Sequence, residues 1–168
     1  MAKKPVRSGQ SADKIYSLQV TIIQGLMSDE FVKKNPVVSR TIQIRGRQTL
    51  DQLHRAIFRA FGREEEHLHE FHFSDQPFSP EAKRYVLPFE MEEEPFGATQ
   101  PAGDLTKTKI ESVNLNPGDV FYYWFDFGDN WWHEIQVTGI EESSAKSRYP
   151  KVAKTVGKSP PQYMYWDE

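Results

Sequence analysis

The sequence predicts an α+β fold in which a mostly antiparallel sheet carries one principal helix on one face. Three features of the sequence favour this class. Short segments rich in β-branched and apolar residues recur along the chain, as strands do. Residues 49–61 repeat their apolar positions at a helical interval, and residues 120–138 are an aromatic segment around one polar turn, which is typical of a β-hairpin. We expect this hairpin to supply much of the core.

The length and composition indicate one domain without covalent cross-links. A chain of 168 residues fits a single domain, and we expect residues 1–14 to be a disordered basic arm and residues 15–168 to form the α+β domain. Zero cysteines exclude disulfides, iron–sulfur clusters and thiolate zinc sites. No apolar run approaches the ~18 residues of a membrane span, and the first residues lack the apolar core of a secretory signal. We therefore expect a cytoplasmic protein that does not enter membranes.

Charge is unevenly distributed along the chain. Residues 1–63 contain 12 Lys/Arg and 4 Asp/Glu, residues 64–142 contain 4 and 18, and residues 143–168 contain 5 and 2, although the net charge is only −3. A basic first third could contact an acidic partner such as nucleic acid. We favour the alternative, in which these segments lie side by side and neutralise one another, because an acidic total disfavours binding to phosphates.

The segment from Thr49 to Phe61 gives the clearest prediction of a helix. Thr49 is suited to cap its first turn, Gln52 completes a capping box, and Gly62 should end the helix. The apolar residues share one face, and they are Leu50, Leu53, Ala56, Ile57, Ala60 and Phe61. His54 lies at the margin of this face, and Arg55, Arg59 and Arg63 are expected on the opposite face.

Other elements are predicted by composition and by turn residues. The expected strands are residues 15–23, 37–44, 68–73 and 85–89. The expected loops are residues 24–36, 74–83 and the acidic segment 90–104, while residues 109–115 form a short element of undecided type and the chain after Glu142 is read as polar and extended.

Two registers are open for the hairpin, and they place different residues together. A two-residue loop, Asp129-Asn130, would put Asp126 opposite His133. A three-residue loop, Gly128-Asp129-Asn130, would pair Phe127 with Trp131 and Phe125 with His133. We favour the second register because it separates the apolar face from the polar face, and register is strongly specified when one face is buried.

Several motifs, in this order, resemble those of the plasmid pRiA4b ORF-3-like family. They are Thr49-Leu50-x-x-Leu53-His54, Ala60-Phe61-Gly62, His67-Leu68-His69-x-Phe71, Asp126-Phe127-Gly128-Asp129-x-Trp131-x-His133, Tyr149-Pro150 and Pro160-Pro161-Gln162-Tyr163. The resemblance covers about residues 15–163. It implies an α+β domain of bacteria and archaea, often associated with plasmids or mobile elements, and it implies no established activity. Many relatives carry a cysteine where this chain reads Lys151-Val152-Ala153-Lys154, so no thiolate chemistry is essential here.

Histidines form one group of candidate chemical residues. His67 and His69 are two apart on the predicted strand and should point the same way, with His72 opposite. They could hold a metal ion, completed by Asp126, Glu70 or His54. No dedicated spacing such as HExxH is present, so we expect no metal and no other cofactor. As the alternative, a metal-assisted hydrolase or nuclease would use His67, His69, His133 and Asp126.

The favoured function is a non-enzymatic binding or adaptor module, because no nucleophile motif and no Gly-rich phosphate loop is present. The candidate binding surface is the outer face and turn of the hairpin, namely Tyr122, Trp124, Asp126, Asp129 and Trp132. His54 and His133 are a candidate pocket. The expected partner is a protein or a nucleic acid, in keeping with the mobile-element association that the resemblance implies.

Overall fold

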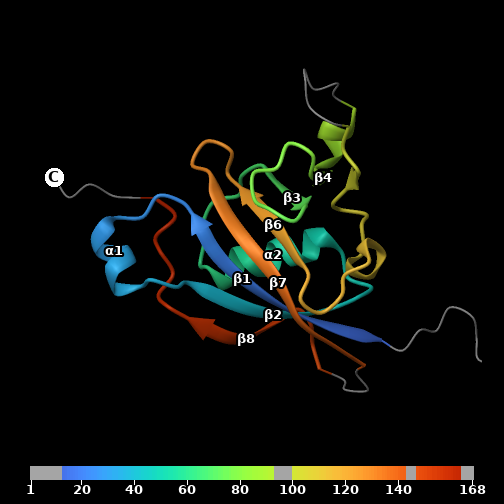
Figure 1. Ribbon diagram of the computed structural model, residues 1–168, viewed down its shortest axis with the longest axis horizontal. Helices are drawn as coiled ribbons and strands as arrows, with labels where there is room; N and C mark the ends of the chain where they lie inside the picture. The colour runs from blue at the N-terminus through green and yellow to red at the C-terminus, as the bar shows by residue number, and fades with distance from the viewer. Residues whose placement is uncertain (1–12, 93–99, 143–146, 164–168) are drawn as a thin grey trace, which may run out of the picture.

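One mixed sheet organises the chain, and the principal helix packs on one of its faces (Figure 1). This computed structural model describes residues 13–92, 100–142 and 147–163. The strand order is β5-β4-β3-β6-β7-β1-β2-β8, and every neighbouring pair is antiparallel except the short β4–β5 pair. The predicted α+β class, with its mostly antiparallel sheet, is therefore confirmed.

The bounds of the elements follow in chain order. They are β1 Lys14–Gln24, α1 Asp29–Lys34, β2 Ser39–Arg45, α2 Leu50–Ala60, β3 His69–Phe73, β4 Lys83–Val86, the 3₁₀ turn η1 Pro88–Met91, β5 Gly103–Asp104, the 3₁₀ turn η2 Ile110–Val113, β6 Val120–Phe125, β7 Trp131–Glu142 and β8 Lys151–Val156. The predicted arm before β1 lies almost wholly outside the described residues, as does part of the acidic segment 90–104. No helix in the described part of the chain is long and apolar enough to cross a membrane.

Helix α2 begins and ends where the sequence predicts. The Thr49 hydroxyl accepts from the Gln52 amide at 3.2 Å and the Gln52 side chain accepts from the Thr49 amide at 2.9 Å, so the capping box forms. Gly62 adopts a φ of 63° after the last turn and reverses the chain. Because the chain reverses there, Arg63 does not share the exposed face of Arg55 and Arg59, as its position in the helical period suggested, but is buried in the core.

Three elements differ from the sequence-based expectations. The expected loop 24–36 contains the six-residue helix α1, which Ser28 caps by accepting from the Phe31 amide. The expected strand 85–89 divides into β4 and η1. The polar tail contributes β8, whose largely exposed side chains give no amphipathic signal; its pairing with β2 supplies its order.

The hairpin keeps the expected faces but not the expected pairing. Phe125 pairs with Trp131 and Tyr123 with His133, so the loop spans five residues, 126–130. The Asp126 carboxylate accepts from the Gly128 and Asp129 amides, and both Asp126 and Asn130 have positive φ, which together hold this wider turn. Both predicted registers are therefore wrong. The shift from the three-residue register is two residues, so the side chains of the two strands stay on their expected faces. Phe127, which now lies in the turn, is the exception, because it stacks on Trp124 on the outer face.

The core lies between α2 and the inner face of the sheet. Its largest fully buried side chains include Trp131, Tyr123, Phe71, Phe121 and Phe125. The Trp131 ring passes so close to Gly25, just after β1, that a Cβ atom there would lie 2.1 Å from it. This position therefore needs glycine for space rather than for backbone conformation.

We predict that Gly25→Ala lowers the free energy of unfolding by about 1–3 kcal/mol, because the new methyl group must displace the buried Trp131 ring. Gly139→Ala in β7 is the matched control, since a Cβ atom at Gly139 meets nothing within 4 Å. The control should change stability by no more than about 0.5 kcal/mol in urea unfolding. Equal stabilities for the two variants would contradict this packing.

Candidate functional site

The outer face of the hairpin carries a stack of aromatic rings. Trp124 stacks on Trp132 with ring centres 5.1 Å apart, and on Phe127 at 4.0 Å. Its Nε1 donates to Asn130 Oδ1 at 2.9 Å. Tyr122 and Trp132 are buried and Trp124 is half-buried. The residues expected to form an open aromatic surface therefore lie on the expected face, but other side chains largely cover them.

Phe78, from the loop between β3 and β4, covers one end of this stack. Its ring meets Trp132 edge-on with centres 4.7 Å apart, yet 52% of the residue stays exposed. Its φ is 60°, a left-handed conformation that bulky residues rarely adopt. The sequence showed this segment only as a loop with two prolines, which gave no indication that one of its rings would extend the outer stack.

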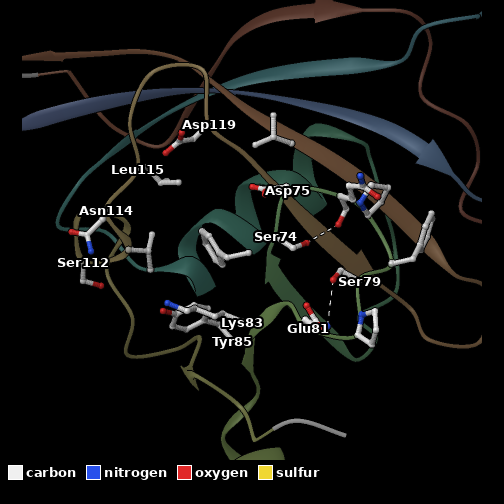
Figure 2. A pocket seen from close by; sticks show the side chains of 17 residues that line it. Ser74, Asp75, Ser79, Glu81, Lys83, Tyr85, Ser112, Asn114, Leu115 and Asp119 are labelled. Atoms are coloured by element: carbon white, nitrogen blue, oxygen red, sulfur yellow. Dashed lines mark hydrogen bonds between the residues drawn. The ribbon is translucent and has the colours of Figure 1, made fainter.

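A hollow of about 890 Å³ opens beside Phe78. Figure 2 shows the side chains that line it, among them those of Asp75, Lys83 and Asp119. It lies between residues 73–85 and residues 112–120, and its wall combines aromatic rings with charged groups. Three carboxylates line it, from Asp75, Glu81 and Asp119, against the single cation of Lys83. Its volume is in the range of ligand-binding clefts.

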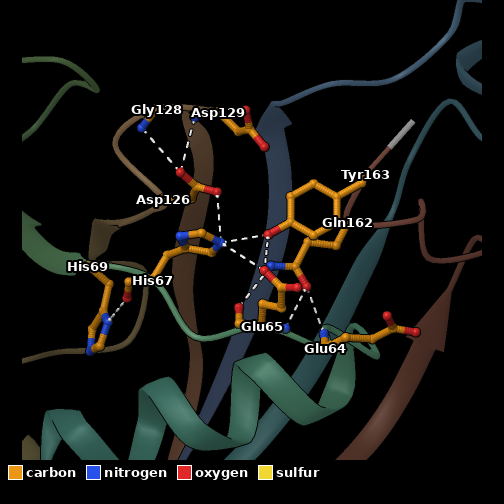
Figure 3. Close-up of polar contacts among 9 residues, drawn as sticks. All are labelled: Glu64, Glu65, His67, His69, Asp126, Gly128, Asp129, Gln162 and Tyr163. Atoms are coloured by element: carbon orange, nitrogen blue, oxygen red, sulfur yellow. Dashed lines mark hydrogen bonds and ion pairs between the residues drawn. The ribbon is translucent and has the colours of Figure 1, made fainter. Parts of the chain in front are cut away.

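Polar side chains also gather around the hairpin turn (Figure 3). His67 Nε2 lies 3.4 Å from Asp126 Oδ2 and 2.7 Å from the Tyr163 hydroxyl, which donates to Glu65 Oε2 at 2.8 Å. The hydrogen bond to the Glu65 carboxylate raises the pKa of Tyr163 to about 12. Asp129 is half-buried beside this cluster, where its amide is bound by Asp126.

The C-terminal segment is fixed to this cluster by Gln162. Its Oε1 accepts from the Glu64 and Glu65 amides, and its Nε2 donates to the Glu65 carbonyl at 2.8 Å. Gln162 is buried, so the segment is part of the packed domain. It packs on the connection between α2 and β3, which also carries Glu66.

His54 and His69 stack on each other between α2 and β3. Their ring centres are 3.5 Å apart and the rings are 5° from parallel. His54 Nδ1 lies 2.5 Å from the Tyr123 hydroxyl, and its Nε2 lies 2.9 Å from Glu66 Oε2. His69 Nδ1 donates to the His67 carbonyl at 2.9 Å. Burial lowers the pKa of His54 to about 2 and also lowers the pKa of His69, so both rings are neutral.

His133 is fully buried and forms a different set of contacts. Its Nδ1 donates to the Tyr123 carbonyl at 3.0 Å, and its Nε2 accepts from Arg63 Nη2 at 2.7 Å. The Arg63 guanidinium also lies over the rings of Phe61, Phe125 and Trp131. Burial, then the charge of Arg63, lowers the pKa of His133 well below its ordinary value.

The structure does not gather the four residues of the metal-hydrolase alternative. Both ring nitrogens of His133 are bound in the core, while His67 faces Asp126 and His69 faces His54. Within the described ranges, the one group of three or more potential ligands with atoms within 4.8 Å of one another is His54, Glu66 and His69. Tyr123 contacts both rings of the expected pocket, through its hydroxyl to His54 and through its carbonyl to His133.

We predict that folding stability falls with pH below about 6.5, partly because His133 stays neutral when folded but is protonated when unfolded. Each pH unit in that range costs up to about 1.4 kcal/mol for one such group. His133→Gln should therefore show a shallower dependence of unfolding free energy on pH between pH 7 and 5, besides a lower stability at pH 7. Parallel slopes for the two proteins in urea unfolding would contradict a neutral buried His133.

Comparison with known proteins places the chain in a family. No curated protein matches it. The crystal structure of a protein of unknown function from Methanosarcina mazei Go1 resembles it with a TM-score of 0.67 and 22% identity, over 90% of this chain and 74% of that chain. At that identity the likeness shows a shared fold alone. A family model described as Plasmid pRiA4b ORF-3-like protein matches residues 29–164, which include α2, the hairpin and the Gln162 segment. The chain therefore belongs to the plasmid pRiA4b ORF-3-like family.

Proposed function

We propose that this protein is a non-enzymatic binding module that takes a basic, partly apolar segment of a protein partner into the hollow beside Phe78. The observation that carries the proposal is Phe78 itself. Its ring is half-exposed at the rim of the hollow while its backbone adopts a disfavoured conformation. Such strain clusters at binding sites, and exposed aromatic rings with a packed base are frequent anchors at interfaces.

The packing beneath Phe78 supports a rigid contact surface. Trp132 lies under its ring and Trp124 lies next in the stack, so the exposed ring is supported by one buried ring and one half-buried ring. His72 meets Trp132 edge-on at 5.2 Å and is itself held by Glu70 at 2.7 Å. A preorganised aromatic anchor loses less conformational entropy on binding than a mobile one.

The charge of the hollow favours a basic protein segment over nucleic acid. Asp75, Glu81 and Asp119 outnumber Lys83 along the wall, so lysine or arginine side chains would be attracted and phosphates repelled. The nearby aromatic rings would contact the apolar part of the same segment. A cytoplasmic location and a role tied to plasmids or mobile elements, as expected from the sequence, complete this proposal.

We predict that peptides selected from a random display library on the immobilised, tag-free protein combine lysine or arginine with an apolar residue. Phe78→Ala should lower the affinity for a selected peptide about tenfold or more, because it removes the anchor ring. Phe89→Ala is the matched control, since Phe89 is also 52% exposed but lies outside the hollow. It should leave the affinity unchanged.

A second variant tests the charge. Asp75→Asn combined with Glu81→Gln removes the charge of two exposed carboxylates that line the hollow. The double variant should bind the selected peptide more weakly, and its affinity should depend less on salt. Peptides that bind Phe78→Ala as well as they bind the wild type would sink the proposed site. Retention of a DNA duplex at physiological salt, with no peptide selected, would instead replace the proposed partner class.

A further inference from the structure

Three potential metal ligands converge from different parts of the chain. His54 lies on α2, Glu66 lies on the connection after it, and His69 begins β3. One ligand atom from each residue lies within 4.8 Å of the other two. Glu66 is exposed while both histidines are buried, so the group faces solvent on its carboxylate side. This arrangement gives an ion an access path from the surface.

His69 presents an unsatisfied nitrogen to this group. Its Nδ1–H donates to the His67 carbonyl, which leaves a lone pair on Nε2. That Nε2 atom is buried, in a residue only 4% exposed, and it meets no hydrogen-bond partner among the described residues. A histidine whose far nitrogen donates to a backbone carbonyl has the tautomer and orientation of a metal ligand.

His54 is held in a corresponding way. Its Nδ1 lies beside the Tyr123 hydroxyl and its Nε2 lies 2.9 and 3.0 Å from the two Glu66 oxygens. In the absence of an ion, Tyr123 can donate to Nδ1 and Nε2–H can donate to Glu66. If the ring proton moves to Nδ1, it can donate to the Tyr123 oxygen, and Nε2 and the carboxylate are then both free to bind a cation.

We propose that the Nε2 atoms of His54 and His69 and the carboxylate of Glu66 bind one divalent first-row transition-metal ion. Two imidazoles and one carboxylate form a donor set suited to zinc and its neighbours, with water completing the coordination. Tyr123 and the His67 carbonyl hold the Nδ1 atoms of the two rings in the metal-free protein, and the ring that does not turn on binding keeps its partner. This site differs from the set of four residues considered from the sequence.

Binding must also break the histidine stack. The lone pair of an imidazole lies in the ring plane, so two parallel rings 3.5 Å apart cannot both direct it at one ion. One ring must turn about its Cβ–Cγ bond, a torsion that is broad for histidine. A bound ion should therefore change the chemical environment of both rings at the same time.

The test is a titration of metal-free, tag-free protein with Zn²⁺ in a calorimeter, followed by Co²⁺ and its visible absorption spectrum. One ion should bind per chain, and the ring-proton NMR signals of His54 and His69 should shift together. Glu66→Gln should weaken Zn²⁺ binding about tenfold or more; because Glu66 is largely exposed, this variant should keep the fold. His67→Gln is the matched control, since it keeps the backbone carbonyl that holds His69 and changes only a side chain outside the group, so it should bind as the wild type does.

Two outcomes would overturn the proposal. Wild-type protein that binds Zn²⁺ no more tightly than Glu66→Gln, with both folded by circular dichroism, would exclude this site. Binding that His67→Gln removes and Glu66→Gln leaves intact would move the ion to the cluster around Asp126. His69→Asn gives an independent check: if it is folded it should bind no ion, and binding with wild-type affinity would contradict the ligand set.

Discussion

The packing of helix α2 against the inner face of the β6–β7 hairpin is the contact on which the rest of the molecule depends. Leu53 and Ile57 of the helix are fully buried in the same core cluster as Phe125 of the hairpin, and the Phe58 ring of the helix meets the Phe125 ring edge-on. The same face carries Tyr123 and His133, whose polar atoms lose their water. Since an unpaired buried polar atom costs about 1–3 kcal/mol, the helix and the chain after it must bring partners to them.

Those partners are His54 and Arg63, but some buried nitrogen atoms nearby still have no hydrogen-bond partner among the described residues. His54 meets the Tyr123 hydroxyl and Arg63 meets His133, but Arg63 Nη1 and His69 Nε2 have no partner among the described residues. An ion at the proposed metal site would bind the His69 Nε2 atom. The packing of the core would then supply one ligand of that site. The proposed peptide site shares no residue with the metal site: Phe78 meets Trp132 on the outer face of the hairpin, and none of the three metal ligands lines the hollow. The two proposals can therefore be tested by separate mutations.

The sequence predicted the periodic parts of the molecule and missed the parts set by the tertiary structure. Helix α2 and the two faces of the hairpin follow from local period and from the capping residues around Thr49. The helical period predicts Arg63 on the exposed face. The chain reverses at Gly62, so Arg63 no longer follows that period and is buried instead. Phe78 and Glu66 lie in connecting segments, where no period tells which way a side chain points. The hairpin pairing was missed because the Asp126 carboxylate holds a five-residue turn.

The stacked histidines should both be neutral, and His69 should keep an unprotonated Nε2 atom within the group that it forms with His54 and Glu66. Nitrogen-15 NMR of the imidazole rings in metal-free protein at neutral pH measures both properties. We predict that His69 carries its proton on Nδ1 and none on Nε2, and that neither His54 nor His69 is cationic. A protonated Nε2 on His69, or a positive charge on either ring, would contradict neutral stacked histidines with a free ligand nitrogen.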